Sequence, residues 1–371
     1  MKVQFLTSYY KPFLNDFFSA NPDLKNQSYQ TIQIRLLEEL FADTGALYYH
    51  TSKAGHEASI IISNCEILQK QWAKENNVQY REDKWMLDIA FCQIKLFKPD
   101  LFYLEYIFDF FGDFLKEVKP FCKYNVAWIS TPLTNFTHIK GVDLILSSTP
   151  DFVEKFREIG LNAEYMHPAF DERILKKINT NSEKNIPFSF VGGWSTIHKN
   201  RKDAINQLVK HTSIQLWGYG YHVPFFKQPF EYCSDLFLYD KQSILNAYNG
   251  SVWGLEMYNI LQRSIITFNV HEKLLKGYVG NMRMFEAAGV GTMILNDNGK
   301  NLPNLFLPGK EIESYNNINE AIEKINYYSI YPEKAIEIGI NAQKRVLREY
   351  NYDRYVENLF HFVCKYSKEL R

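Results

Sequence analysis

Short apolar runs alternate with amphipathic stretches along the first half of the chain. The runs are rich in Val, Ile, Leu and aromatic residues, which favours buried strands, and the stretches between them repeat apolar residues at helical spacing. Strands that alternate with helices form parallel sheets covered on both faces. The pattern predicts strands at Val3–Leu6, Ala58–Ser63, Leu101–Glu105, Val126–Ile129 and Leu144–Ser147, and helices at Tyr29–Leu40, Asp83–Phe97 and Asp151–Ile159.

The polar segment His167–Asn185 interrupts this alternation and is the best candidate for a domain boundary. The alternation then restarts, and a second parallel sheet follows. Two consecutive doubly wound domains of Rossmann-like α/β type, with a cleft between them, are the simplest architecture. In this half we expect strands at Phe188–Val191, Ile214–Trp217, Ile265–Asn269 and Thr292–Leu295, and helices at Arg201–Lys210, Met282–Ala288 and Ile318–Tyr328.

The last stretch, from Pro332 to Leu370, contains two helical runs broken near Asn351. The second run places Tyr355 and Leu359 on one face, so it is long enough and apolar enough to pack back on the first domain. The alternative is a helical cap on the second domain alone. We therefore expect an N-terminal domain over 1–170, a C-terminal domain over 186–350 and a helical tail over 351–371.

Composition and charge exclude several classes of protein. The chain has 371 residues, which favours two domains, and its 42 Lys plus Arg balance its 42 Asp plus Glu. Because the chain has no net charge, it has no overall positive electrostatic potential that would attract nucleic acid. Nucleic acid is therefore not an expected partner. The five cysteines are widely spaced and form no CxxC pair, which argues against a zinc cluster and a disulfide framework.

The start of the chain and its hydropathy predict a cytoplasmic protein. Ser8 and Lys11 come too early for a signal-peptide core, and no apolar run approaches the roughly 18 residues of a spanning helix. The aromatic-rich stretch 102–114 leaves peripheral association with the inner face of a membrane open. A buried face between the domains is the favoured alternative for this stretch.

The segment 269–297 carries the clearest candidate chemistry. Asn281 can cap the helix that follows it, and the first-turn amides of a helix suit a phosphate. Arg283 and Glu286 are three residues apart and share one helix face, so a cation for phosphate and an acceptor for vicinal hydroxyls project together. The alternative is an ordinary helix on which Arg283 and Glu286 only pair with each other.

A second candidate opens the C-terminal domain. Gly192 and Gly193 end a predicted strand and let backbone approach a ligand, and His198 and Arg201 follow near a helix start. A diphosphate is the natural ligand for such a turn, and a solvated charged turn is the alternative. Gly218 ends the next predicted strand. The turn there is not specific for a ligand by itself, but Gly218 is included among the candidate ligand-binding residues.

The first domain supplies candidates for an acceptor base. Glu105 ends the predicted strand at 101–105, Asp109 follows it, and His167 begins the boundary segment. The carboxyl ends of parallel strands face the ligand crevice, which is where a base is needed. Taken singly, each of these residues is more often structural or solvated than catalytic, because strand ends often carry polar residues.

Several motifs together resemble the CgeB-like (spore-maturation type) bacterial glycosyltransferases of the GT-B fold. They are FVGGWSTIHKNR, LWGYG, NMRMFEAAGVGTMILND and NLPNLFLPGKEIESY, in that order. The resemblance implies transfer of a sugar from a nucleoside diphosphate sugar, with UDP-sugar favoured. The acceptor would be a glycan, a lipid-linked glycan or a protein in bacterial surface glycoconjugate synthesis.

The resemblance also implies residue roles. Glu286 would bind the donor ribose, and Arg283, Arg201 and the Gly192–Gly193 turn would bind the diphosphate. His271, at a strand end, would contact the diphosphate or the transferred sugar. Enzymes of this fold usually need no metal, and the chain has no DxD motif, so neither a metal nor a cofactor is expected.

One departure from the family pattern leaves the stereochemical outcome open. Retaining GT-B enzymes commonly carry two glutamates eight positions apart; Glu286 matches the second, but the first falls on Tyr278. Two alternative functions remain on the same fold. One is a nucleotide-sugar epimerase, which needs a paired acid and base in the first domain, and the other is a degenerate glycan-binding scaffold.

Overall fold

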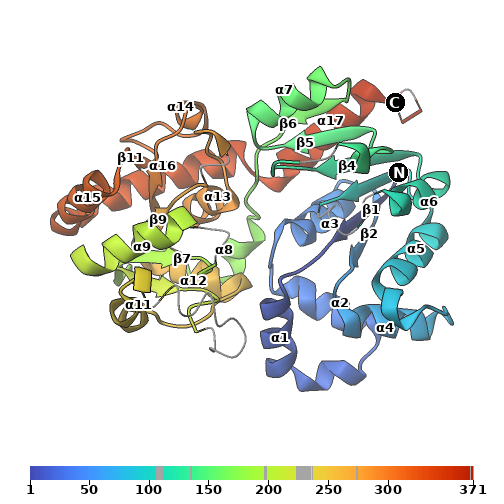
Figure 1. The fold of residues 1–371 in the computed structure, drawn as a ribbon, viewed down its shortest axis with the longest axis horizontal. Helices are drawn as coiled ribbons and strands as arrows, with labels where there is room; N and C mark the ends of the chain where they lie inside the picture. The colour runs from blue at the N-terminus through green and yellow to red at the C-terminus, as the bar shows by residue number, and fades with distance from the viewer. Residues whose placement is uncertain are drawn as a thin grey trace. The chain divides into compact units, whose positions relative to one another are not determined.

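The computed structural model describes residues 1–105, 110, 112–133, 136–195, 199–222, 235, 237–272, 275–367 and 369–370. The chain forms two compact units (Figure 1). Unit 1 comprises Met1–His167 and Tyr352–Arg371, and unit 2 comprises Pro168–Asn351. The polar segment expected at the boundary begins at this division, but from Pro168 onward it belongs to unit 2.

Unit 1 is built on a six-stranded parallel sheet of order β2-β1-β3-β4-β5-β6. The five strands predicted in this half are confirmed. The sheet's strands are β1 (Lys2–Thr7), β2 (Glu57–Ile62), β3 (Leu101–Leu104), β4 (Tyr124–Trp128), β5 (Leu144–Ser147) and β6 (Ala163–Tyr165). The helices are α1 (Lys11–Ala20), α2 (Tyr29–Glu38), α3 (Asp43–Lys53), α4 (Glu66–Glu75), α5 (Trp85–Phe97), α6 (Asp113–Val118), α7 (Pro150–Glu158) and α17 (Tyr352–Tyr366).

The C-terminal helix α17 packs on α3 within unit 1. Tyr355 is buried, and its hydroxyl lies 2.9 Å from that of Tyr103 on β3. Near the end of the helix, Lys365 Nζ and Tyr366 Oη each lie 2.6 Å from Glu164 Oε1 on β6. These contacts tie both ends of α17 to the sheet of unit 1.

Unit 2 is built on a five-stranded parallel sheet of order β11-β10-β9-β7-β8. The four strands predicted in this half are confirmed. The strands are β7 (Ile186–Val191), β8 (Gln215–Trp217), β9 (Ser264–Asn269), β10 (Met293–Asp297) and β11 (Glu313–Tyr315). The helices are α8 (Arg173–Lys177), α9 (Lys199–His211), α11 (Lys241–Ala247), α12 (Gly254–Arg263), α13 (Met282–Gly289), α14 (Leu302–Leu305), α15 (Ile318–Ile330) and α16 (Pro332–Glu349).

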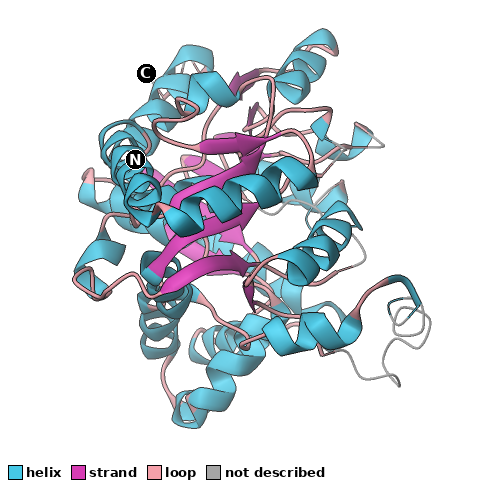
Figure 2. Ribbon diagram, turned by 90° about the vertical axis from the view of Figure 1, so that its left-hand side faces the viewer, coloured by secondary structure: helices cyan, strands magenta, loops and turns pink. Residues whose placement is uncertain are grey.

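Alternating side chains of the central strands of unit 2 form one buried core with helices α9, α11 and α15. Its strand residues include Phe188, Phe190, Ile266, Phe268, Met293 and Leu295. Helices α12, α13 and α16 contact the same strands. The strands run through the interior with helices on either side (Figure 2), as the alternating sequence pattern predicts.

The segment that follows Pro168 is held in unit 2 by buried contacts. Phe170 is 1% exposed, and its amide donates to the Tyr350 carbonyl at 2.8 Å. Helix α13 passes so close that a Cβ on Gly289 would lie 2.2 Å from the Phe170 ring. Lys184 donates to the carbonyls of Gln262 and Ser264, and burial lowers the pKa of Lys184 to about 8.

Candidate functional site

The strand order of unit 2 places a switch point between β7 and β9. From β7 the chain crosses to β8 on one side, and from β9 it crosses to β10 on the other. In such sheets ligands bind in the crevice outside the carboxyl ends of the strands at the switch point. The loops after β7 and β9 hold Gly192, Gly193 and His271, and helix α9 brings Arg201 beside them.

A cavity of about 990 Å³ adjoins this point at the carboxyl ends of β9, β10 and β11. Helix α9 lines part of the cavity through residues such as Asn200 and Asp203. The loop that holds Lys276 and Tyr278 lines another part. The ammonium group of Lys300 lies 5.2 Å from the centre of the Tyr278 ring. The position where the family pattern has its first glutamate therefore presents an aromatic ring and a nearby cation.

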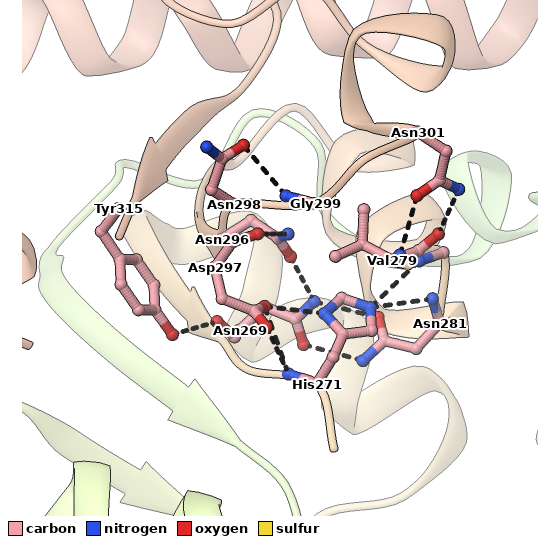
Figure 3. Close-up of polar contacts among 11 residues, drawn as sticks. Asn269, His271, Val279, Asn281, Asn296, Asp297, Asn298, Gly299, Asn301 and Tyr315 are labelled. Atoms are coloured by element: carbon pink, nitrogen blue, oxygen red, sulfur yellow. Dashed lines mark hydrogen bonds and ion pairs between the residues drawn. The ribbon is translucent and has the colours of Figure 1, made fainter. Parts of the chain in front are cut away.

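His271 uses both of its ring nitrogens within the protein (Figure 3). Nδ1 lies 2.7 Å from Asp297 Oδ1, and Nε2 accepts the backbone N–H groups of Gly280 at 3.0 Å and Asn281 at 3.2 Å. Nε2 can accept only as the unprotonated nitrogen, so the proton sits on Nδ1 and is donated to Asp297. His271 thus fixes the loop before α13, and its expected contact with the donor stays a prediction.

Side-chain amides extend this network across the strand ends (Figure 3). Asn269 and Asn281 exchange two hydrogen bonds of 2.9 and 3.0 Å, and Asn269 Nδ2 also donates to Asn296 Oδ1 at 2.6 Å. Tyr315 Oη donates to the Asn269 carbonyl at 3.0 Å. The ends of β9, β10 and β11 are therefore tied to the start of α13.

Asn281 stands at the N-cap position, but its side chain makes no capping hydrogen bond. This corrects the expectation that it caps the helix. Its amide is engaged with Asn269 instead, and its backbone N–H is bound by His271. The loop before it is held by Asn301, which accepts the Val279 N–H at 2.9 Å and donates to the Val279 carbonyl at 2.7 Å.

Arg283 and Glu286 are brought together on α13, as their spacing predicts. Arg283 Nη1 lies 2.7 Å from Glu286 Oε2 and 3.0 Å from Met257 Sδ. The hydroxyl of Tyr258 donates to Glu286 Oε1 at 3.3 Å. Both side chains are mostly buried against α12 and neither lines the cavity, so they form an inward-facing pair rather than a solvated one.

The predicted glycines pack two loops against each other. Gly218 has φ of +132°, and a Cβ there would lie 2.3 Å from the Gly192 carbonyl oxygen. A Cβ on Gly193 would lie 2.6 Å from the ring of Tyr219. The loops after β7 and β8 are also joined by the Gly192 N–H, which donates to the Trp217 carbonyl at 2.9 Å. Close approach of backbone is thus required here, and it is satisfied by the protein itself.

Arg201 is the incompletely partnered cation of this region. Its Nη1 donates to the Gly193 carbonyl at 3.2 Å, and its guanidinium lies 5.7 Å from the centre of the Phe190 ring. Its buried Nε has no hydrogen-bond partner within the described part of the chain. Burial lowers the pKa of Arg201, and the positive charge of Arg283 adds to the lowering against the opposing effects of Tyr221 and Glu272.

The next residue, Lys202, is fully partnered by contrast. Its Nζ lies 3.0 Å from both carboxylate oxygens of Asp235, which also accepts Trp194 Nε1 at 2.6 Å. The pair is buried, so this part of α9 anchors the helix. His198 lies outside the described residues.

In unit 1 the switch point lies between β1 and β3, and Glu105 follows β3 there. The buried Oε2 of Glu105 has no hydrogen-bond partner among the residues that the structure describes. Burial, reinforced by the charge of Asp43, raises the pKa of Glu105 well above its usual range, although a hydrogen bond with Thr7 opposes the rise. The raised pKa favours the protonated form of Glu105.

The other two candidates in unit 1 are less informative. His167 follows β6, is half-buried and sets its ring edge-on to Tyr165, with ring centres 4.7 Å apart. Asp109 lies outside the described residues, as does much of the aromatic-rich stretch, of which Phe102, Phe110 and Phe114 are buried.

The sequence did not single out Asn269, Asn296, Asn301 or Tyr315. The available signal was a polar residue at the end of a buried run, as in FNVH and LNDN. Within the described residues, no group of three or more His, Cys, Asp or Glu side chains is placed to hold a metal ion. None of the described helices is long and apolar enough to cross a bilayer.

A family model described as glycosyl transferase-like matches residues 173–361. No curated protein matches the chain in sequence. The solved structures that resemble it include HepE from Anabaena in complex with UDP and glucose, with 12% identity, 98% of this chain and 100% of that chain covered, and a TM-score of 0.62.

Two further structures cover the chain from end to end. Sucrose-phosphate synthase from Thermosynechococcus elongatus has 9% identity, covers 98% of this chain and 99% of its own, and gives a TM-score of 0.57. AviGT4, a glycosyltransferase involved in avilamycin A biosynthesis, has 10% identity, covers 99% and 98%, and gives 0.61. At these identities the likeness establishes the GT-B fold.

Proposed function

Because the chain belongs to the glycosyl transferase-like family, we propose that it transfers a sugar from a nucleoside diphosphate sugar held by unit 2. The acceptor is a glycan, a lipid-linked glycan or a protein held by unit 1, in bacterial surface glycoconjugate synthesis. The CgeB-like type is part of the proposal, as are a cytoplasmic location and association with the inner face of a membrane. The family match favours transfer over epimerisation.

Arg201 is the observation that carries the donor assignment. A buried guanidinium with an N–H that has no partner among the described residues is electrostatically incomplete. A diphosphate supplies the missing acceptor and neutralises the charge of Arg201. Its place beside the switch point of the sheet is where such a ligand binds in this class of fold.

The remaining donor contacts follow from α13. The Met284 N–H already donates to the Asn281 carbonyl at 3.1 Å, so the amides nearest the start of the helix are the ones that can reach a ligand. The positive end of the helix favours the charge that develops on the leaving diphosphate. Glu286 is the ribose acceptor, and reaching the ribose requires it to share or leave its contact with Arg283. His271 acts as a positioning residue, because it holds the Gly280 and Asn281 amides in place.

UDP is the favoured nucleotide, since HepE was solved with UDP and with UDP-glucose. We propose that transfer needs neither a metal ion nor a cofactor, because arginine side chains and a helix end stabilise the diphosphate instead. In unit 1, Glu105, Asp109 and His167 remain the candidates for the acceptor base. Glu105 would have to lose its proton before it could act.

A thermal-shift panel tests the proposal. UDP, GDP, TDP, CMP and ADP are added to the purified protein with and without EDTA. A ligand at about 100 times its dissociation constant adds roughly 2.7 kcal/mol to stability, so one diphosphate should raise the melting temperature regardless of EDTA. UDP-glucose and related donors are then incubated with candidate acceptors, and release of the nucleoside diphosphate is measured. No shift with any nucleotide contradicts the donor assignment and favours a scaffold.

A further inference from the structure

A second cavity, of about 350 Å³, lies within unit 1 between strands β1 and β2 and helices α2, α4 and α5. Trp72 and Asn76 come from the end of α4, and Gln93 and Phe97 from the end of α5. Helices that follow strands of a parallel sheet end near the amino edge of that sheet. The cavity therefore lies away from the carboxyl edge where Glu105 stands.

Two amide side chains at this cavity are buried but incompletely partnered. Gln4 is 1% exposed and Gln93 is 5% exposed, and the Oε1 atom of each has no hydrogen-bond partner among the described residues. The nitrogen end of Gln4 is engaged, since its Nε2 donates to Ser59 Oγ at 3.3 Å. A buried acceptor left unmatched costs about 1–3 kcal/mol, so two together need an explanation.

The Tyr29 hydroxyl adds a donor to these two acceptors. It accepts Gln33 Nε2 at 2.6 Å, so its own proton can be donated to a further acceptor. Burial raises the pKa of Tyr29, which keeps that proton in place. Gln33 is itself fixed by a bond of 3.1 Å to the Ile60 carbonyl.

The residues that line the cavity restrict the class of ligand that it can bind. Each residue that lines this cavity is described, and none of them carries a charge. Trp72, Tyr48 and Phe97 contribute ring surface, while the amides and the phenol contribute hydrogen bonds. Phosphates, carboxylates and amines have no counter-charge here, whereas a ring that bears hydroxyl groups and an apolar C–H face matches both features.

We propose that this cavity binds one uncharged sugar ring, at a saccharide site of unit 1 that is separate from the donor site. Sugar hydroxyls donate to Gln4 Oε1 and Gln93 Oε1 and accept from Tyr29 Oη, and Trp72 covers one face of the ring. The volume is at the lower end of ligand cavities and suits one ring rather than a nucleotide sugar. Because the site lies at the amino edge, it holds a sugar that does not react.

The test is ligand-observed NMR on the full chain with glucose, galactose, mannose and N-acetylglucosamine, and with glucuronic acid and glucose 6-phosphate as charged counterparts. At least one neutral sugar should bind, and saturating UDP should not displace it. Gln93→Leu should weaken that binding at least ten-fold, while Gln27→Leu, the same change at an exposed glutamine of unit 1, should leave it unchanged.

Two readouts keep the test decisive if Gln93→Leu does not fold. Trp72→Leu should also lose the sugar, and in the wild-type protein sugar should increase amide-exchange protection at residues 29–33 and 58–60. Failure of all neutral sugars to bind means that water alone fills the cavity and overturns the proposal. Displacement by UDP, or stronger binding of the charged sugars, also overturns it. UDP binding is measured separately, so failure of the donor-site proposal can be distinguished from failure of the saccharide-site proposal.

Discussion

The two sheets share one strand order around their switch points, yet the two points carry opposite chemistry. At the switch point of unit 2, a buried N–H of the Arg201 guanidinium has no partner among the described residues. At the switch point of unit 1, a buried oxygen of the Glu105 carboxyl, whose pKa is raised, has none among them. A cation that lacks acceptors suits an anionic donor, and an uncharged carboxyl suits a hydroxyl-bearing acceptor. Under the proposed function, this difference in charge would distinguish the two substrates on a shared scaffold.

A second contrast lies within unit 2 itself. Hydrogen bonds within the protein engage the side chains of His271, Asn269 and Asn296. The Nε–H of Arg201, by contrast, has no partner among the described residues. Fully partnered polar groups contribute to the stability of the fold, and open ones cost stability until a ligand arrives. Substitutions of the two kinds should therefore separate into losses of stability and losses of binding.

The largest effect on stability is expected from His271→Ala. The substitution leaves the Gly280 and Asn281 amides without their acceptor and removes one donor from Asp297. With about 1–3 kcal/mol for each unmatched buried group, we expect a loss of about 3 kcal/mol or more. Denaturant unfolding measures it, with His211→Ala at the exposed end of α9 as the control. A change within error of the control would mean that the network is not stabilising.

Glu105→Gln should act in the opposite direction and stabilise the protein at neutral pH. The unfolded chain ionises Glu105 near its ordinary pKa, but the fold keeps it protonated, so wild-type stability falls as pH rises from that value toward the raised pKa. The amide removes this dependence, so the variant should be more stable than the wild type at pH 7. Unfolding curves of both proteins from pH 4 to pH 8 test it. Parallel curves would show that Glu105 is ionised in the fold.

A smaller effect is expected where α17 meets α3. Burial alone would raise the pKa of Asp353, but hydrogen bonds from Lys53 and His50 outweigh it and lower the pKa below its ordinary value. This contribution is present above the ordinary pKa and disappears as pH falls through the lowered one. Because Asp353 is half exposed, Asp353→Asn should cost at most about 1 kcal/mol. Thermal unfolding at neutral and acid pH should show that cost only at neutral pH.

The smallest effect on stability is expected from Arg201→Met. Among the described residues its guanidinium donates to the Gly193 carbonyl, and an apolar side chain of similar length can fill its place beside Phe190. Removing a buried, incompletely partnered charge offsets the loss of that bond, so the free energy of unfolding should stay within about 0.5 kcal/mol of wild type. A large loss in the ligand-free protein would assign Arg201 to the scaffold instead of the site.

The elements were predictable where a strand is long and buried, and less so at the sheet edges. Strands β6 and β11 were not predicted, because each has three residues, pairs on one side and carries a glutamate. The places of His271 and Asn281 near a strand end and a helix start could be predicted from the sequence. Their partners could not, since Asp297 is 26 positions from His271 and Asn269 is 12 from Asn281. Gly192 and Gly193 were expected to let backbone approach a ligand. In the structure, the part of the chain that approaches them is the neighbouring loop.

Calorimetric titration of UDP into the wild-type protein, Arg201→Met and Lys210→Met tests the central claim most directly. Lys210 is an exposed cation of the same helix, so its loss controls for charge. We predict that the wild type and Lys210→Met bind UDP alike, and that Arg201→Met binds about ten-fold more weakly or worse while it remains folded. Equal affinity in all three proteins would contradict the assignment of Arg201 to the diphosphate.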